Sequence, residues 1–120
     1  MRMRMLQLAA LFGAMLAAPV AAQSIPGQYA VAGTNLDGSP YGGSAEIVMT
    51  SDTSCAIVWH TGSTSSHGIC MRLGKVFSAG YALGDKVGMV IYRIEPDGTL
   101  NGVWTMAGMN GAGTEVLTPQ

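Results

Sequence analysis

Closely spaced turns are the feature that most constrains the fold of this chain. Beyond Pro26, short runs of residues are separated by turn residues, and no run repeats apolar side chains at helical intervals of three and four. Sixteen of the 98 residues after position 22 are glycine, which suits many turns rather than helices. This pattern predicts an all-β domain. We place eight strands near 27–34, 41–50, 54–61, 66–72, 75–82, 86–94, 99–107 and 112–118.

Alternation along these runs predicts how the strands are arranged. Over 88–94 the even positions are Gly, Val, Tyr and Ile, and over 100–106 they are Leu, Gly, Trp and Met. One face is therefore apolar with large aromatic side chains, and the other is mixed. Tight Asp-Gly turns at 35–39 and 95–99 favour sequential hairpins. Eight such strands predict an up-and-down β-barrel, which has no free edge, and a two-sheet β-sandwich is the alternative.

Residues 1–22 are typical of a secretory signal peptide, which leaves 23–120 as the single barrel domain. A short positive start precedes an apolar run over 8–18, and small residues lead to an expected cleavage after Ala22. That run is too short to span a bilayer, which needs about 20 residues. We therefore expect a periplasmic or secreted protein whose mature chain has no transmembrane segment.

The charge of the mature chain excludes two classes of partner. Without Arg2 and Arg4, four basic side chains remain against seven acidic ones, a net charge of −3. No basic patch is present to bind nucleic acid or an anionic membrane surface.

The two cysteines are predicted to form a disulfide, because an even pair in an oxidising compartment is normally bonded. A hairpin centred between Gly62 and Ser63 pairs residues whose numbers add to 125, as those of Cys55 and Cys70 do. The bridge would then run directly across two strands, on the same face as Trp59. Whether the loop has two or four residues is left open.

The same hairpin carries both histidines. The register makes His60 and His67 diagonal neighbours on one face, a span that two imidazoles can close over a metal ion. No third ligand is evident beside them, so we expect no metal site and no cofactor. With Ser63 and Ser65 they form an exposed hairpin, which is a candidate surface for an extracellular or envelope protein partner.

No arrangement of residues predicts catalysis, and we expect that the protein is not an enzyme. The serines near the histidines are typical of a loop, and the sequence contains no nucleophile elbow. Most of the carboxylates are expected in turns or on the outer face. Glu115 is the exception, because either it or Val116 must face the interior. An inward Glu115 needs a polar partner there.

The aromatic residues either fill the barrel or line a ligand cavity, since eight strands enclose little more than side chains or one small ligand. Tyr29 and Phe77 belong to this inward set. The candidate ligand-binding residues are Tyr41, Trp59, Tyr92, Trp104, Met106 and Glu115. We predict an exported binding protein that takes a small apolar ligand in the barrel or a protein partner through its loops. A structural envelope protein without a discrete ligand is the alternative.

Three stretches share spaced Gly, Tyr, Asp-Gly and Trp residues over nearly the whole mature chain: Gly27-x-Tyr29-x-Val31-x-Gly33-Thr34-Asn35-x-Asp37-Gly38-Ser39-x-Tyr41-x-Gly43, Trp59-x-Thr61-Gly62, and Asp97-Gly98-x-Leu100-x-Gly102-x-Trp104-Thr105 with Gly113-Thr114-Glu115-x-Leu117-Thr118-Pro119. This combination resembles a family of small exported alphaproteobacterial proteins, largely uncharacterised, some of which are automatically labelled fibronectin-binding. The resemblance implies a Gram-negative envelope protein and brings no catalytic residues.

Overall fold

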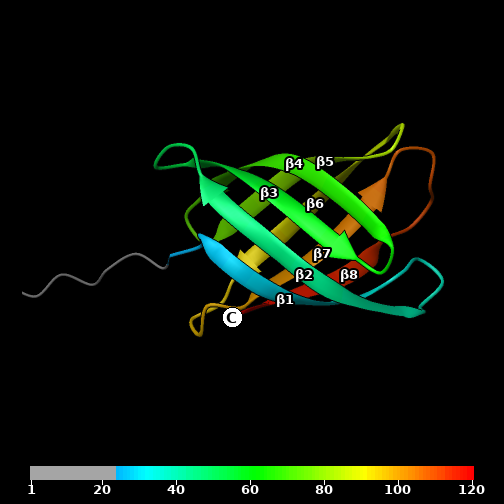
Figure 1. Ribbon diagram of the computed structural model, residues 1–120, viewed down its shortest axis with the longest axis horizontal. Helices are drawn as coiled ribbons and strands as arrows, with labels where there is room; N and C mark the ends of the chain where they lie inside the picture. The colour runs from blue at the N-terminus through cyan, green and yellow to red at the C-terminus, as the bar shows by residue number, and fades with distance from the viewer. Residues whose placement is uncertain (1–23) are drawn as a thin grey trace, which may run out of the picture.

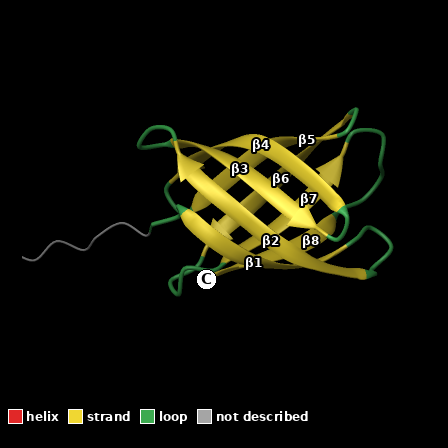
Figure 2. Ribbon diagram, viewed as in Figure 1, coloured by secondary structure: helices red, strands yellow, loops and turns green. Residues whose placement is uncertain are grey.

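The computed structural model describes residues 24–120, and the signal peptide predicted over 1–22 lies outside them. The described chain forms one closed antiparallel sheet in which each strand pairs with the next and β8 returns to pair with β1 (Figures 1 and 2). The predicted up-and-down barrel is confirmed, and the β-sandwich alternative is wrong. The strands are β1 (Gly27–Thr34), β2 (Pro40–Met49), β3 (Ser54–Thr61), β4 (Thr64–Leu73), β5 (Val76–Leu83), β6 (Lys86–Ile94), β7 (Leu100–Met106) and β8 (Gly113–Pro119).

Within residues 24–120, no helix is long and apolar enough to cross a membrane.

The turns follow the chemistry of their residues. In the two Asp-Gly turns, Asp37 and Asp97 each accept hydrogen bonds from the backbone N–H and the hydroxyl of Ser39 and Thr99, at 2.7–3.0 Å. The glycine after each aspartate has φ of 88° and 89°, a conformation that favours glycine. Between β3 and β4, Thr61 pairs with Thr64, so the loop left open by the sequence has two residues.

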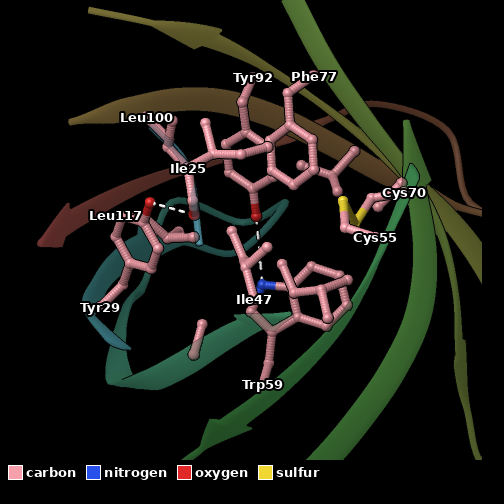
Figure 3. Close-up of a cluster of buried hydrophobic side chains, with 14 of the residues drawn as sticks. Ile25, Tyr29, Ile47, Cys55, Trp59, Cys70, Phe77, Tyr92, Leu100 and Leu117 are labelled. Carbon is pink, nitrogen blue, oxygen red and sulfur yellow. Dashed lines mark hydrogen bonds between the residues drawn. A yellow bond between two sulfur atoms is a disulfide. The ribbon is translucent and has the colours of Figure 1, made fainter. Parts of the chain in front are cut away.

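One end of the barrel is filled with side chains (Figure 3). Ile25, just before β1, is only 1% exposed, and its carbonyl oxygen accepts a 2.6 Å hydrogen bond from the Tyr29 hydroxyl. Phe77 and Tyr92 stack with ring centroids 5.1 Å apart. The fully buried Leu100 and Leu117 complete this packing. Ile25, where the chain enters, and the buried side chains of the strands thus fill this end of the barrel.

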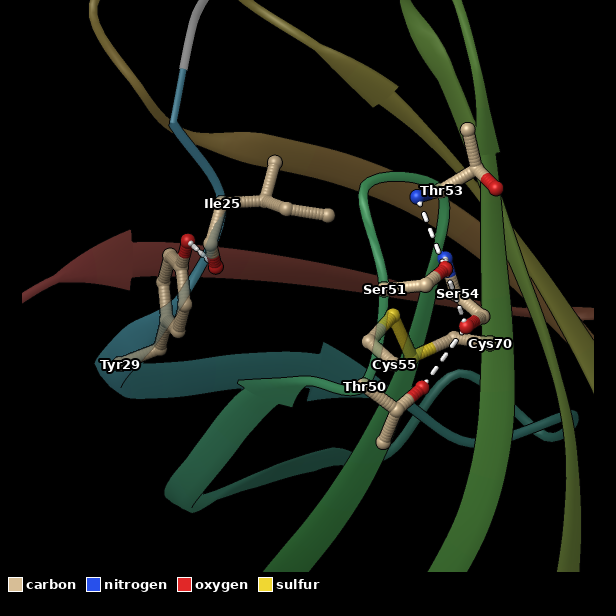
Figure 4. The surroundings of a disulfide bond; sticks show 8 residues. All are labelled: Ile25, Tyr29, Thr50, Ser51, Thr53, Ser54, Cys55 and Cys70. Carbon is tan, nitrogen blue, oxygen red and sulfur yellow. Dashed lines mark hydrogen bonds between the residues drawn. A yellow bond between two sulfur atoms is a disulfide. The ribbon is translucent and has the colours of Figure 1, made fainter.

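A disulfide braces the same end (Figure 4). Cys55 and Cys70 are direct register partners on β3 and β4, and their sulfur atoms are 2.09 Å apart. Both side chains are buried, on the inward face that carries Ile57 and Trp59. The predicted pairing and its face are confirmed. Beside it, the Ser54 hydroxyl hydrogen-bonds within the β2–β3 turn.

The outer face differs from one side of the barrel to the other. Over β1 and β2 it carries polar and small side chains such as Gln28 and Glu46, which hydrogen-bond to each other. From β4 to β7 it exposes large apolar side chains, namely Ile69, Met71, Leu73, Val76, Val87, Met89, Ile91 and Val103. The outer face therefore combines polar and apolar side chains, as expected from the sequence, and the apolar ones are concentrated on β4 to β7.

Candidate functional site

The other end of the barrel is hollow. The β1–β2, β3–β4, β5–β6 and β7–β8 turns gather at this end, on the right in Figure 1. From this end a cavity of about 270 Å³, here called the cup, reaches into the barrel. Its lining residues are Asn35, Tyr41, Thr61, Trp59, Thr64, Ser66, Tyr81, Leu83, Val90, Trp104, Met106 and Glu115. The volume of the cup is just below the usual range for small-molecule sites, which begins at about 300 Å³.

Glycines on neighbouring strands make room for the aromatic walls of the cup. A Cβ atom on Gly33 would lie 2.3 Å from Cζ of Tyr41, and one on Gly113 would lie 2.4 Å from Cε2 of Trp104. Both positions therefore admit only glycine while the rings stay where they are. The same cross-strand pairing recurs around the barrel, in Gly33–Tyr41, Gly88–Tyr81, Gly102–Tyr92 and Gly113–Trp104.

The four rings that line the cup meet in two edge-on pairs. Tyr41 and Trp104 have centroids 6.3 Å apart with their planes at 72°, and Trp59 and Tyr81 are 5.4 Å apart at 64°. This edge-to-face geometry is favourable because the positive ring edge meets the negative face of its neighbour. The walls are therefore held in place by contacts among themselves as well as by the sheet.

Glu115 is a buried carboxylate among these rings, with 6% of its surface exposed. The alternation left it or Val116 facing inward, and the structure places Glu115 inside and Val116 outside. Its Oε1 accepts a 2.7 Å hydrogen bond from the Tyr41 hydroxyl. Its Oε2 accepts a 3.0 Å bond from Nε1–H of Trp59 and a further bond from the Tyr92 hydroxyl. All three partners donate, which is the arrangement that satisfies an ionised carboxylate.

A direct hydrogen bond also joins the Trp59 indole to the Tyr92 hydroxyl. Nε1–H of Trp59 lies 3.2 Å from the Tyr92 hydroxyl oxygen (Figure 3). That oxygen therefore accepts from the indole while its proton is given to Glu115. Among residues 24–120, no buried side-chain nitrogen or oxygen lacks a hydrogen-bond partner. The network is complete, as a buried polar cluster must be to avoid a large desolvation cost.

The tyrosines around Glu115 are held in their neutral, donating form. Burial, and secondly the negative charge of Glu115, raise the pKa of Tyr81 to about 12. The same two causes, in the same order, raise the pKa of Tyr41 and of Tyr92 well above the usual value. A phenolate beside the carboxylate would be both poorly solvated and repelled.

Five of the six residues selected from the sequence line the cup: Tyr41, Trp59, Trp104, Met106 and Glu115. The sixth, Tyr92, lies fully buried beneath the cup and is linked to it through the hydrogen bonds of its hydroxyl with Glu115 and Trp59. Tyr29 and Phe77, the other inward aromatic residues, belong to the filled end. Sequence reasoning missed Tyr81, although it follows Phe77 and Ala79 at every second position of β5 and so shares their inward face.

The four residues proposed as a partner-binding hairpin, His60, Ser63, Ser65 and His67, are all exposed on β3, β4 and their turn. The predicted diagonal placement of the histidines is confirmed, since His60 pairs with Ser65 and Val58 with His67. Nδ1 of His60 and the Ser65 hydroxyl are hydrogen-bonded at 2.9 Å. Within residues 24–120, no group of three or more His, Cys, Asp or Glu side chains is placed to hold a metal ion.

No protein-family model and no curated protein sequence matches the chain. Among solved structures, a redesigned β-barrel superposes with a TM-score of 0.73 at 15% identity, covering 85% of this chain and 99% of that one. A redesigned barrel named mFAP1, bound to DFHBI, gives 0.70 at 18% identity, covering 78% and 94%. A de novo designed fluorescence-activating barrel gives 0.65 at 16%, covering 86% and 100%. These similarities establish the fold.

Proposed function

We propose that this chain is a non-enzymatic binding protein of the bacterial envelope that holds a small, largely apolar molecule in the cup. The observation that carries the proposal is the contrast between the two ends of the barrel. One end is packed solid around Leu100 and Leu117, whereas the other keeps an opening of about 270 Å³ walled by aromatic rings over one carboxylate. Apolar walls with a few convergent polar groups are the usual composition of a small-molecule site.

The similar solved structures support this choice at the level of the fold. A redesigned barrel that superposes on this chain is bound to DFHBI. A small closed β-barrel of eight strands has room for one small ligand in its interior, which is consistent with this choice.

The geometry favours the cup over the exposed hairpin as the binding surface. His60 is engaged with Ser65 inside its own hairpin, and Thr61, Thr64 and Ser66 of that hairpin form part of the cup wall. Catalysis is less supported than binding, because Glu115 is engaged by three hydrogen-bond donors. A purely structural protein gives no physical reason to keep one end hollow.

The envelope location rests on the leader and on the disulfide. Residues 1–22 have the charge and hydropathy order of a secretory signal, and the Cys55–Cys70 bridge is typical of oxidising compartments. The resemblance to alphaproteobacterial envelope proteins is consistent with this location, and the family assignment stays a prediction.

A pair of adjacent substitutions tests the proposal. Ser66 lines the cup, whereas its neighbour Ser65 faces outward, so Ser66→Trp fills the cup and Ser65→Trp adds the same side chain outside. Each variant is titrated with N-phenyl-1-naphthylamine, a neutral probe whose fluorescence rises in apolar surroundings. We expect saturable binding to the unsubstituted protein and to Ser65→Trp, and at least about tenfold weaker binding to Ser66→Trp, which corresponds to about 1.4 kcal/mol.

Circular dichroism and thermal unfolding establish that both variants keep the barrel. Failure of the unsubstituted protein to bind the probe saturably, or equal binding by a folded Ser66→Trp, would overturn the proposed function.

A further inference from the structure

The charged side chain that lines the cup is an acidic one. Glu115 contributes a carboxylate, and among residues 24–120 no Lys, Arg or His side chain lines the cavity. The partners of this carboxylate are two phenol hydroxyls and an indole N–H, which are dipoles without net charge. A buried charge balanced only by dipoles leaves a negative potential in the low-dielectric space around it.

The hydrogen-bond donors of the cup's rings are already directed at protein acceptors. The hydroxyl of Tyr81 donates to the carbonyl oxygen of Thr105 at 3.0 Å, and Nε1–H of Trp104 points to the carbonyl oxygen of Thr114 at 3.3 Å. The donors of Tyr41 and Trp59 go to Glu115. With these donors engaged, the four rings offer an occupant aromatic surface and oxygen lone pairs in place of N–H and O–H donors. An anionic head group would have to displace one of these bonds to gain a donor from a ring, and it would also be repelled by the charge of Glu115.

We propose that the ligand of the cup is a small organic cation, with an ammonium group held among the rings near Glu115 and an apolar body toward Leu83 and Met106 at the wall. The inference rests on the proposed function, since it names the chemical class of the molecule bound there. Aromatic faces attract a cation through the ring quadrupole, most strongly where water is excluded. The carboxylate adds a full opposite charge, so a cation gains from two features that a neutral ligand of the same shape does not use.

A series of three ligands with one shape and three charges tests the inference. Benzyltrimethylammonium is the cation, neopentylbenzene is its carbon isostere without charge, and phenylmethanesulfonate is an anion on the same benzyl frame. Each is titrated against the disulfide-bonded protein, by quenching of the intrinsic tryptophan fluorescence and by competition with N-phenyl-1-naphthylamine. We expect the cation to bind at least about tenfold more tightly than the isostere, and the anion to bind more weakly than both.

A matched pair of substitutions assigns the preference to the carboxylate. Glu115→Gln removes the charge inside the cup and nearly keeps the shape, whereas Glu46→Gln removes the same charge from the exposed outer face of β2. We expect the cation preference to fall at least about threefold in Glu115→Gln, where only the attraction of the rings remains, and to persist unchanged in Glu46→Gln. The affinity of neopentylbenzene should be similar in all three proteins. The ligand series on the unsubstituted protein stands on its own if Glu115→Gln does not fold.

The outcomes separate this inference from the function on which it rests. Binding of the isostere or the anion as tightly as the cation overturns the cation inference and leaves the binding function standing. Loss of the preference in Glu46→Gln as well as in Glu115→Gln also overturns it, because the effect would then be one of net charge. If no ligand of the series binds and N-phenyl-1-naphthylamine does not bind either, the proposed function fails with the inference.

Discussion

At the scale of single residues, Glu115 connects the interior of the barrel. It gathers hydrogen bonds from Tyr41 on β2, Trp59 on β3 and Tyr92 on β6 while lying on β8 itself. The sequence predicted that Glu115 or Val116 faces inward, and it could not decide between them, because both fit the alternation of β8. The deciding partners lie 23 to 74 positions away in the chain, so a local pattern carries no information about them.

Replacing Glu115 with leucine is expected to destabilise the protein. Glu115→Leu leaves the hydroxyls of Tyr41 and Tyr92 without their carboxylate acceptor and Trp59 Nε1–H with only its 3.2 Å bond to Tyr92, and each lost partner costs about 1–3 kcal/mol. The free energy of unfolding, measured with urea, should fall by about 2–5 kcal/mol. Adding Tyr92→Phe to Glu115→Leu should bring little recovery, because it removes the orphaned hydroxyl together with the remaining acceptor of the Trp59 indole N–H. An unchanged free energy of unfolding in Glu115→Leu would show that the network contributes no stability.

The tyrosines near Glu115 make the protein sensitive to alkaline pH. Burial and the charge of Glu115 raise the pKa of Tyr81 from 10.0 to about 12 in the folded state. The stability that this shift contributes is fully present below pH 10, and it is lost as the pH rises toward 12. Urea unfolding across this interval should show a falling free energy, with a shallower fall in Tyr81→Phe. An identical slope in Tyr81→Phe would contradict the assignment.

At the scale of strands and turns, most of the structure could be predicted from the sequence. The strand boundaries agree within about two residues, because six of the seven turns contain a glycine and each strand has a two-residue period. The register of β3 with β4 followed from one turn and two cysteines. The pairing of Gly113 with Trp104 could not be predicted, because the β7–β8 connection over 107–112 is too long for a local turn signal to set the register of that hairpin.

A glycine inside a strand is expected to matter where a ring or a neighbouring backbone occupies the space that a Cβ atom would take. Gly33→Ala would place a Cβ 2.3 Å from the Tyr41 ring, so we expect about 1–3 kcal/mol lower stability and a displaced ring. Gly80 on β5 has open space at the same position and is the matched control. Gly80→Ala should leave the free energy of unfolding unchanged or raise it slightly. Urea titrations of both variants check this, and equal effects would contradict the proposed fit between glycines and rings.

At the scale of the whole molecule, the barrel combines a packed half and a hollow half. The inward faces of Tyr29, Phe77, Tyr41 and Trp104 were all apparent from alternation. Alternation says nothing of height along the barrel axis, and so it could not tell that the first two pack the filled end and the last two wall the cup. That distinction depends on the tilt and stagger of the strands around the closed sheet.

The two halves should respond differently to the loss of side-chain volume. Leu100→Ala opens a cavity in the packed half, where Leu100 is fully buried, and should lower the free energy of unfolding by about 2–5 kcal/mol without changing affinity for N-phenyl-1-naphthylamine. Met106 lines the cup and so already adjoins open space. Met106→Ala should therefore lower the free energy of unfolding by less than Leu100→Ala does, and it should change the affinity for N-phenyl-1-naphthylamine. If Leu100→Ala changed the affinity for the probe and Met106→Ala did not, the cup would not be the binding half.

Native mass spectrometry of the protein, secreted into the periplasm of a Gram-negative host and purified without refolding, tests most directly whether the cup carries a molecule. We expect a discrete added mass on the native ion of the unsubstituted protein and of Ser65→Trp, and its absence from Ser66→Trp. The denatured mass in the same experiment reports cleavage after Ala22 and the Cys55–Cys70 bridge. A native ion without added mass in the unsubstituted protein, or the same added mass on Ser66→Trp, would contradict the claim that the cup holds the ligand.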